Sequence, residues 1–114
     1  MKSILLVDDN HDFLDILSYA LREKKINIIL AYNGEDAINN LKKIKFDLMC
    51  SDYEMGERNG LELLAYLREN NNSTKFIMLT GHNDLDLQKK VEFKNGIFID
   101  KTTPDLVNKI IKNL

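Results

Sequence analysis

The chain has 114 residues, with 44% hydrophobic and 30% charged residues and a net charge of −2 at pH 7. These values are typical of one soluble globular domain and exclude a disordered chain or a disulfide-stabilised scaffold. The slight acidic excess argues against non-specific nucleic-acid binding, and no apolar run is long enough for a leader or a membrane span, so we expect a cytoplasmic protein that does not bind membranes.

The first half of the chain alternates short apolar runs with amphipathic segments. Residues 3–7 and 26–31 are apolar runs that predict buried strands. Between them, apolar residues at helical spacing predict one stripe along a helix of about three turns. The members of this stripe are Phe13, Ile16, Leu17, Ala20 and Leu21. A second helix is expected after Asn33 and Gly34, with Ala37, Ile38 and Leu41 on its apolar face.

The second half continues the same alternation. Strands are predicted at residues 46–51, 75–79 and 96–99, the first of them with Cys50 as a buried rather than a reactive thiol. Leu61, Leu64 and Leu67 predict a helix between the first two of these strands, whereas residues 85–96 fit a helix only loosely. In the last helix, Thr103 is expected to be the cap and Pro104 the first residue. Its apolar stripe is Val107, Ile110, Ile111 and Leu114.

Single helices between successive strands favour parallel pairing through right-handed crossovers. We therefore predict an α/β fold with one doubly wound, five-stranded parallel sheet of flavodoxin-like order 2-1-3-4-5 and helices on both faces. No linker or shift in composition divides the chain, so residues 1–114 are expected to form one domain. In this topology, ligands bind beyond the carboxyl ends of strands 1 and 3, where the strand order reverses.

Carboxylates follow the two strands at this reversal point. Asp8 and Asp9 follow the first strand, and Asp52 follows the third. Like charges that crowd together raise one another's pKa or recruit a cation, and a few carboxylates with water suit Mg²⁺. Helix capping would equally explain Asp8 and Asp9 taken alone. The addition of Asp52 favours a magnesium site.

A hydroxyl and an ammonium are expected at the same edge. Thr80 ends the fourth strand, and the fifth strand runs into Lys101. Each has an ordinary interpretation, as a strand-end threonine and a surface lysine. Together with a metal site and Asp52, they supply what phosphoryl transfer needs: a carboxylate nucleophile, a cation and donors for phosphoryl oxygens.

These five positions, with their spacing, resemble the response-regulator receiver domain of two-component signalling, of the chemotaxis-regulator type. The sequence Leu-Leu-Val-Asp-Asp at residues 5–9 is similar to the family's first strand. The sequence Asp-Tyr-Glu-Met at residues 52–55, followed by Gly60, is similar to its acceptor loop. The resemblance covers essentially the whole chain.

The resemblance implies a role for each matching position. Asp52 would be the phosphoacceptor and would bind Mg²⁺ together with Asp9 and the backbone carbonyl of Glu54, with Asp8 helping through water. Lys101 would pair with the Asp52 carboxylate before phosphorylation and with a phosphoryl oxygen afterwards. The hydroxyl of Thr80 would move to donate to the phosphoryl group.

The resemblance implies three further roles, two of which have simpler alternatives. Phe98 on the fifth strand would switch its packing together with Thr80, or it is an ordinary core phenylalanine. Glu54 and His82 would tune the lifetime of the acyl phosphate, although an exposed loop histidine also explains His82.

The chain departs from the family pattern after the lysine and the methionine. The lysine is usually followed by a proline in a cis peptide, but here Thr102 follows it. A cis bond without proline would cost about 3 kcal/mol, so a different loop is expected. Gly56 replaces a common proline and should loosen the loop after Asp52.

The resemblance therefore implies a switch that takes its phosphoryl group from a sensor histidine kinase or phosphotransfer protein. It would assist its own phosphorylation and dephosphorylation rather than act as an enzyme, and would signal to an unknown downstream protein or output domain. The alternatives are a pseudo-receiver that binds proteins without phosphorylation, a flavin carrier and a Mg²⁺-dependent phosphatase. The acidic first loop disfavours the flavin carrier, and the phosphatase needs its nucleophile after the first strand. The chain is expected to be either a stand-alone receiver or part of a longer regulator.

Overall fold

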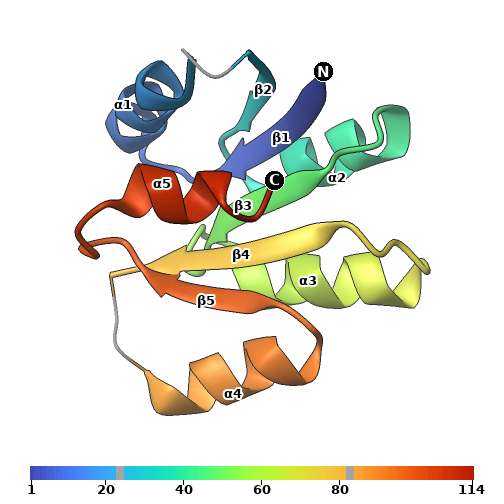
Figure 1. The fold of residues 1–114 in the computed structure, drawn as a ribbon. Helices are drawn as coiled ribbons and strands as arrows, with labels where there is room; N and C mark the ends of the chain where they lie inside the picture. Colours follow the sequence, from blue (N-terminus) through green and yellow to red (C-terminus); the bar gives the residue numbers. More distant parts are fainter. Residues whose placement is uncertain (23–24, 82–83) are drawn as a thin grey trace.

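Five parallel strands form one sheet of order β2-β1-β3-β4-β5 in the computed structural model, which describes residues 1–22, 25–81 and 84–114 (Figure 1). The strands are β1 (Lys2–Val7), β2 (Ile26–Ala31), β3 (Leu48–Asp52), β4 (Lys75–Thr80) and β5 (Ile97–Asp100). The helices are α1 (His11–Leu21), α2 (Gly34–Lys43), α3 (Gly60–Glu69), α4 (Leu85–Phe93) and α5 (Leu106–Ile111). The predicted α/β fold and strand order are confirmed.

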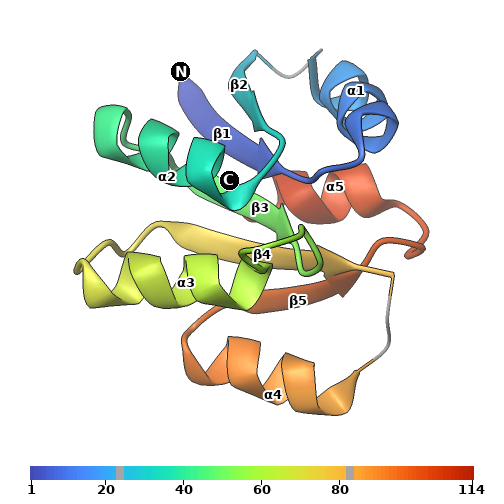
Figure 2. The ribbon, with the colours of Figure 1, turned by 180° about the vertical axis from the view of Figure 1, so that it is seen from behind.

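Helices cover both faces of the sheet (Figures 1 and 2). One buried cluster lies between the sheet and α2, α3 and α4, and a second lies between the sheet and α1 and α5. Successive residues of a strand point to opposite faces. On β4, for example, Phe76 and Met78 belong to the first cluster, and Ile77 and Leu79 belong to the second. Both faces are therefore apolar, and only the strand ends are left for polar chemistry.

The predicted apolar stripe of α1 is wrong in part. Its buried residues are Leu14, Leu17 and Leu21, whereas Ile16 is 71% exposed and Ala20 is also exposed. The helix is capped by Asn10, whose side chain accepts from the backbone N–H of Phe13 at 3.0 Å. This start, together with the path of the chain from β1, places Leu14 rather than Ile16 against the sheet.

The predicted start of α5 is also wrong. Thr103 is not the helix cap but belongs to the preceding turn, in which its N–H donates to the carbonyl of Asp100 at 3.0 Å. The helix begins two residues after Pro104, at Leu106, and its N-cap Asp105 has a left-handed backbone (φ 64°) with no side-chain capping bond. Its apolar stripe packs as predicted, with Ile110 fully buried.

Smaller differences concern the strand ends and α4. Phe46, Asp47 and Gly96 lie just before β3 and β5 rather than within them. Residues 85–93 do form a helix, which buries Leu87 and Val91. Cys50 is buried as predicted, and burial raises the pKa of its thiol. Within the part of the chain that the structure describes, no helix is both long and apolar enough to cross a membrane.

Arg68 on α3 joins three segments at the amino-terminal edge of the sheet. Its guanidinium donates to backbone carbonyls of the α3–β4 connection and of the residues that follow α4. The acceptors are Asn72 and Thr74 (both 3.0 Å), Lys94 (2.8 Å) and Asn95 (3.2 Å). Partial burial lowers the pKa of Arg68, but a guanidinium stays charged in proteins. One side chain thus satisfies four carbonyls that regular structure leaves unpaired.

Candidate functional site

Three aspartates meet at the carboxyl ends of β1 and β3. The two strands are paired, with Val7 opposite Ser51, so Asp8 and Asp9 come next to Asp52. One carboxylate oxygen from each aspartate lies within 4.8 Å of those from the other two. The side chains of Asp8 and Asp52 are 1% and 13% exposed, and Asp9 is exposed. This group of hard oxygen donors, open on one side, could hold a divalent metal ion.

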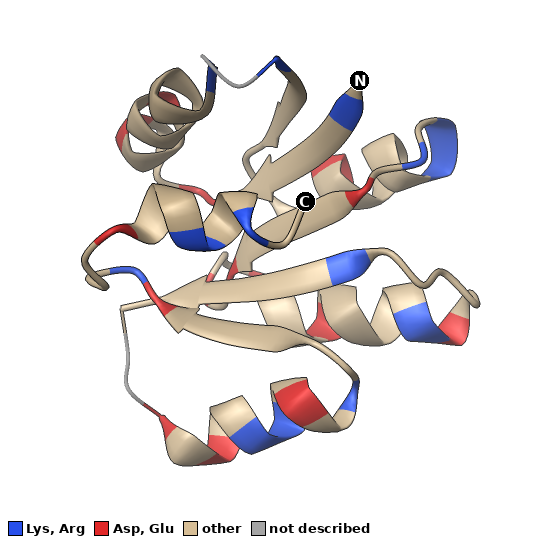
Figure 3. Cartoon of the chain, in the orientation of Figure 1, with Lys and Arg blue, Asp and Glu red and all other residues tan. Residues whose placement is uncertain are grey.

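The distribution of charge sets this edge apart from the opposite one. Lys2 and Lys75 lie at the amino ends of β1 and β4, whereas aspartates lie at or just beyond the carboxyl ends of β1, β3 and β5 (Figure 3). At the carboxyl edge, the ammonium of Lys101 pairs with two of these aspartates, Asp8 and Asp52.

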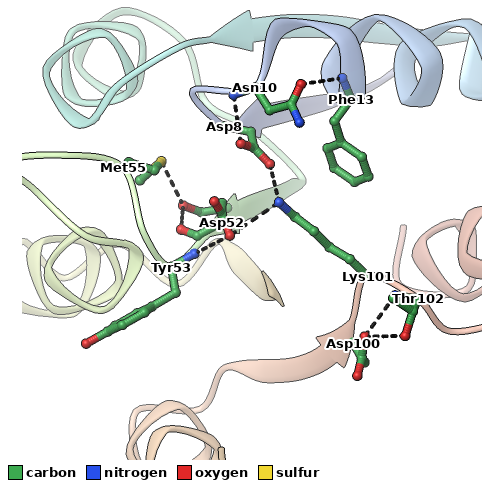
Figure 4. Close-up of polar contacts among 10 residues, drawn as sticks. Asp8, Asn10, Phe13, Asp52, Tyr53, Met55, Asp100, Lys101 and Thr102 are labelled. Carbon is green, nitrogen blue, oxygen red and sulfur yellow. Dashed lines mark hydrogen bonds and ion pairs between the residues drawn. The ribbon is translucent and has the colours of Figure 1, made fainter. Parts of the chain in front are cut away.

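Lys101 reaches into the aspartate group from the end of β5 (Figure 4). Its ammonium is 2.6 Å from Asp8 Oδ2 and 3.4 Å from Asp52 Oδ1. The expectation from the family was a pairing with Asp52, but here the shorter ion pair is with Asp8. Asp8 is the more deeply buried carboxylate and gains most from a direct counter-charge.

The Asp52 carboxylate is held in a partly desolvated position. Its Oδ1 accepts from the backbone N–H of Tyr53 at 2.9 Å. Burial, followed by the charge of Asp8, raises the pKa of Asp52, while Lys101 and the Tyr53 N–H partly oppose this shift. Asp52 is therefore not fully compensated by its neighbours, which suits a group that attracts a cation or attacks phosphorus.

The backbone around Asp52 leaves no room for a side chain at Gly60. A Cβ added to Gly60 would lie 2.3 Å from the backbone oxygen of Asp52 and 2.7 Å from Met78 Sδ. The Gly60 N–H donates to the carbonyl of Tyr53 at 2.8 Å, and the Ser51 hydroxyl donates to that of Asp52 at 2.9 Å. The start of α3 is thus packed directly against Asp52.

Thr80 and Lys101 are brought together by the pairing of β4 and β5. Thr80, which is 1% exposed, lies opposite Asp100 in the sheet, and its carbonyl accepts from the Lys101 N–H at 2.9 Å. The buried hydroxyl-bearing residue and the lysine therefore share one corner of the site.

The loop after Lys101 uses a side-chain turn instead of a proline. The Lys101–Thr102 peptide is trans, as are the other peptide bonds of the described residues. Asp100 Oδ1 accepts from both the N–H (2.8 Å) and the hydroxyl (2.7 Å) of Thr102. These bonds, the N–H bond first, lower the pKa of Asp100. The turn fixes the backbone on both sides of Lys101.

Sequence reasoning missed Asn10, Phe13, Asp100 and Thr102. Phe13 counted only as a member of an apolar stripe, yet Lys101 Nζ lies 4.6 Å from the centroid of its ring. The Asp-Lys-Thr sequence at residues 100–102 was a readable signal, because an aspartate two residues before a threonine predicts a side-chain turn.

The three remaining predicted site residues are Glu54, Phe98 and His82. Glu54 is exposed in the loop after β3, beside the buried Met55 and before Gly56, which has φ 79°. Phe98 on β5 is half-buried and packs against the cluster beneath α2, α3 and α4. His82 lies outside the described residues.

The fold and this site define a known class of protein. The family model of the response regulator receiver domain matches residues 4–110, so the chain belongs to that family. Receiver domains of this family are found in the response regulators of two-component systems.

Individual relatives agree with this assignment. The chain is 37% identical over 106 residues to the transcriptional regulatory protein CpxR of Escherichia coli, which covers 92% of this chain and 45% of CpxR. The present chain thus spans less than half the length of the first curated relatives that it matches. Among solved structures, the response regulator TrrA of Thermotoga maritima in complex with Mg²⁺-BeF is 29% identical, with a TM-score of 0.84 and complete coverage of both chains. A CheY-like receiver protein of Methanospirillum hungatei is 25% identical, with a TM-score of 0.90 over 98% of this chain and 92% of that one.

Proposed function

We propose that this domain, over residues 1–114, is a Mg²⁺-dependent phosphorylation switch with Asp52 as the phosphoacceptor. The observation that carries the proposal is the meeting of Asp8, Asp9 and Asp52 within 4.8 Å, with the Lys101 ammonium beside Asp8 and Asp52. Phosphoryl transfer needs a nucleophilic carboxylate, a place for a metal ion and a fixed ammonium, and all three meet at the carboxyl ends of the strands.

The phosphoryl group comes from a phosphohistidine of a sensor histidine kinase or phosphotransfer protein. An Asp52 carboxylate oxygen attacks phosphorus, the P–N bond to the imidazole breaks, and the bond's electron pair leaves with the imidazole, which is then protonated. The raised pKa of Asp52 matches this role, since a poorly compensated carboxylate is the more basic nucleophile.

The residues at the site fit Mg²⁺, which prefers oxygen ligands and keeps several waters. Asp9, Asp52 and the backbone carbonyl of Glu54 would bind it, with Asp8 acting through water. When bound, the ion supplies positive charge that offsets the phosphoryl oxygens. The similar TrrA was solved with Mg²⁺-BeF.

Lys101 and Thr80 stabilise the phosphoryl group through their ammonium and hydroxyl. The movement of Thr80 is followed by Phe98, which changes the surface that a downstream protein or output domain binds. Glu54 and His82 set the lifetime of the acyl phosphate. The domain acts in the cytoplasm and contacts neither nucleic acid nor membrane itself.

The test is phosphorylation with Mg²⁺ and a small-molecule phosphodonor, measured by intact mass. Wild type should gain one phosphoryl group, and the gain should require Mg²⁺. Asp52→Asn should gain none, whereas Asp15→Asn, which removes an exposed carboxylate from α1, should behave as wild type. If the wild-type protein gains no phosphoryl group under these conditions, the proposal is wrong. The domain would then be a phosphorylation-independent binding module.

A further inference from the structure

Four residues of the site form a closed circuit of contacts (Figure 4). The N–H of Asn10 donates to Asp8 Oδ1 at 2.9 Å, and the Asn10 side chain accepts from the N–H of Phe13 at 3.0 Å. The Phe13 ring lies 4.6 Å from Lys101 Nζ, which in turn donates to Asp8 Oδ2 at 2.6 Å. The same aspartate thus fixes the ring's backbone through Asn10 and binds the ammonium that the ring faces.

Both partners of the ring contact are sheltered. Phe13 is half-buried and packs against the core beneath α1 and α5, and the Lys101 side chain is 20% exposed. An ammonium is attracted to an aromatic face, and the attraction grows when the pair is removed from water. The ring therefore holds the lysine more firmly than an exposed aromatic residue would.

The proposed function creates a conflict that this contact resolves. A divalent ion among Asp8, Asp9 and Asp52 repels the ammonium that now pairs with Asp8. Lys101 must then give up much of that ion pair and stay close enough to reach a phosphoryl group on Asp52. An aromatic face attracts the ammonium, yet it offers no oxygen that would compete for the metal ion.

We propose that Phe13 is a positioning residue that keeps the Lys101 ammonium beside Asp52 through its aromatic face while a metal ion occupies the aspartate group. The inference rests on the proposed phosphorylation of Asp52. Phe13 itself touches neither the metal ion nor the phosphoryl group in this role. It acts only through the direction and reach of Lys101.

The test replaces Phe13 site-specifically with mono-, di- and trifluorinated phenylalanine. Fluorine withdraws charge from the ring face but changes its shape little, so a purely structural ring would tolerate the series. At saturating Mg²⁺ and phosphodonor, the phosphorylation rate constant should fall step by step, by about 3- to 10-fold in total. Phe13→Leu should match the trifluorinated protein, and Phe13→Tyr should retain the rate within about 2-fold.

Two further measurements make the outcome decisive. Fluorination of Phe93, which is 87% exposed on α4, should leave the rate unchanged. The ε-methylene protons of Lys101 should show a ring-current shift in Mg²⁺-loaded wild type that Phe13→Leu abolishes. A flat fluorine series in a protein that is phosphorylated on Asp52 would overturn the role of Phe13 alone, whereas a wild type that is never phosphorylated overturns the proposed function.

Discussion

Lys101 forms its shorter ion pair with Asp8, at 2.6 Å between Nζ and Oδ2. Asp8 is almost completely buried, so without this ammonium its charge would be poorly compensated. The arrangement gives the lysine two duties. It compensates Asp8 in this structure, and under the proposed function it would turn toward Asp52 once a metal ion binds the aspartate group.

Asp8→Asn should weaken Mg²⁺ binding by about 10-fold or more, because the proposed water-mediated ligand loses its charge. A calorimetric Mg²⁺ titration measures this change. Asp86→Asn, at the exposed first turn of α4, alters the net charge equally and serves as the control. Equal affinities in wild type and Asp8→Asn would contradict a role of Asp8 at the metal ion.

Asp52 gives the domain a stability that depends on pH. Its pKa in the folded protein is raised above 3.8, so the folded state binds this proton more tightly than the unfolded state. In the absence of Mg²⁺, its contribution is therefore most favourable below pH 3.8 and is lost as the pH rises through the raised value. Asp52→Asn should remove this loss, so that its advantage in unfolding free energy over wild type grows with pH. Urea unfolding of both proteins across this range measures the difference, and a constant difference would be evidence against the raised pKa.

Mg²⁺ should stabilise the wild type against unfolding, because it binds the assembled aspartate group and not the unfolded chain. At ten times its dissociation constant the expected gain is about 1.4 kcal/mol. Urea unfolding with Mg²⁺ and then with a chelator measures the gain. Asp52→Asn should gain clearly less, and a gain of the same size would place the ion elsewhere.

The turn between Asp100 and Thr102 should hold the Lys101 side chain in the direction of Asp52. Asp100→Ala removes the acceptor of two hydrogen bonds and should slow phosphorylation by about 5-fold. Asp100→Asn keeps an acceptor oxygen and should stay close to wild type. Rates with a small-molecule phosphodonor compare the variants. Slowing by Asn to the same extent as by Ala would assign the effect to the charge of Asp100 rather than to the turn.

Gly60→Ala should destabilise the domain by about 1–3 kcal/mol, because its Cβ would overlap the backbone oxygen of Asp52. Gly81→Ala places a methyl group in open space and is the matched control. Urea unfolding gives both values. A neutral Gly60→Ala would show that α3 can move away from Asp52 at little cost.

The fold and the aspartate group were predictable because both follow from regular alternation. Buried runs separated by single helices require parallel strands, and the carboxyl ends of β1 and β3 then bring Asp8, Asp9 and Asp52 together. No contact between particular side chains had to be known for that step.

Features decided by competing local contacts were not predictable. The sequence of α1 allows two overlapping apolar stripes, and the path of the chain selects the one with Leu14 rather than Ile16. Thr103 suits a helix cap, but it is part of the turn that follows Asp100, and the helix begins only after Asp105. The preference of Lys101 for Asp8 depends on how deeply the fold buries each carboxylate, which no spacing reveals.

The four carbonyls held by Arg68 have a consequence for how the domain opens. Because one guanidinium links α3 to the connection before β4 and to the residues that follow α4, none of these segments can detach without breaking bonds to a charged donor. The backbone amides of these three elements should therefore exchange with deuterium as one cooperative unit. In Arg68→Ala, α4 should exchange faster than α3, because α4 is then held by the two buried side chains Leu87 and Val91, whereas α3 buries three leucines.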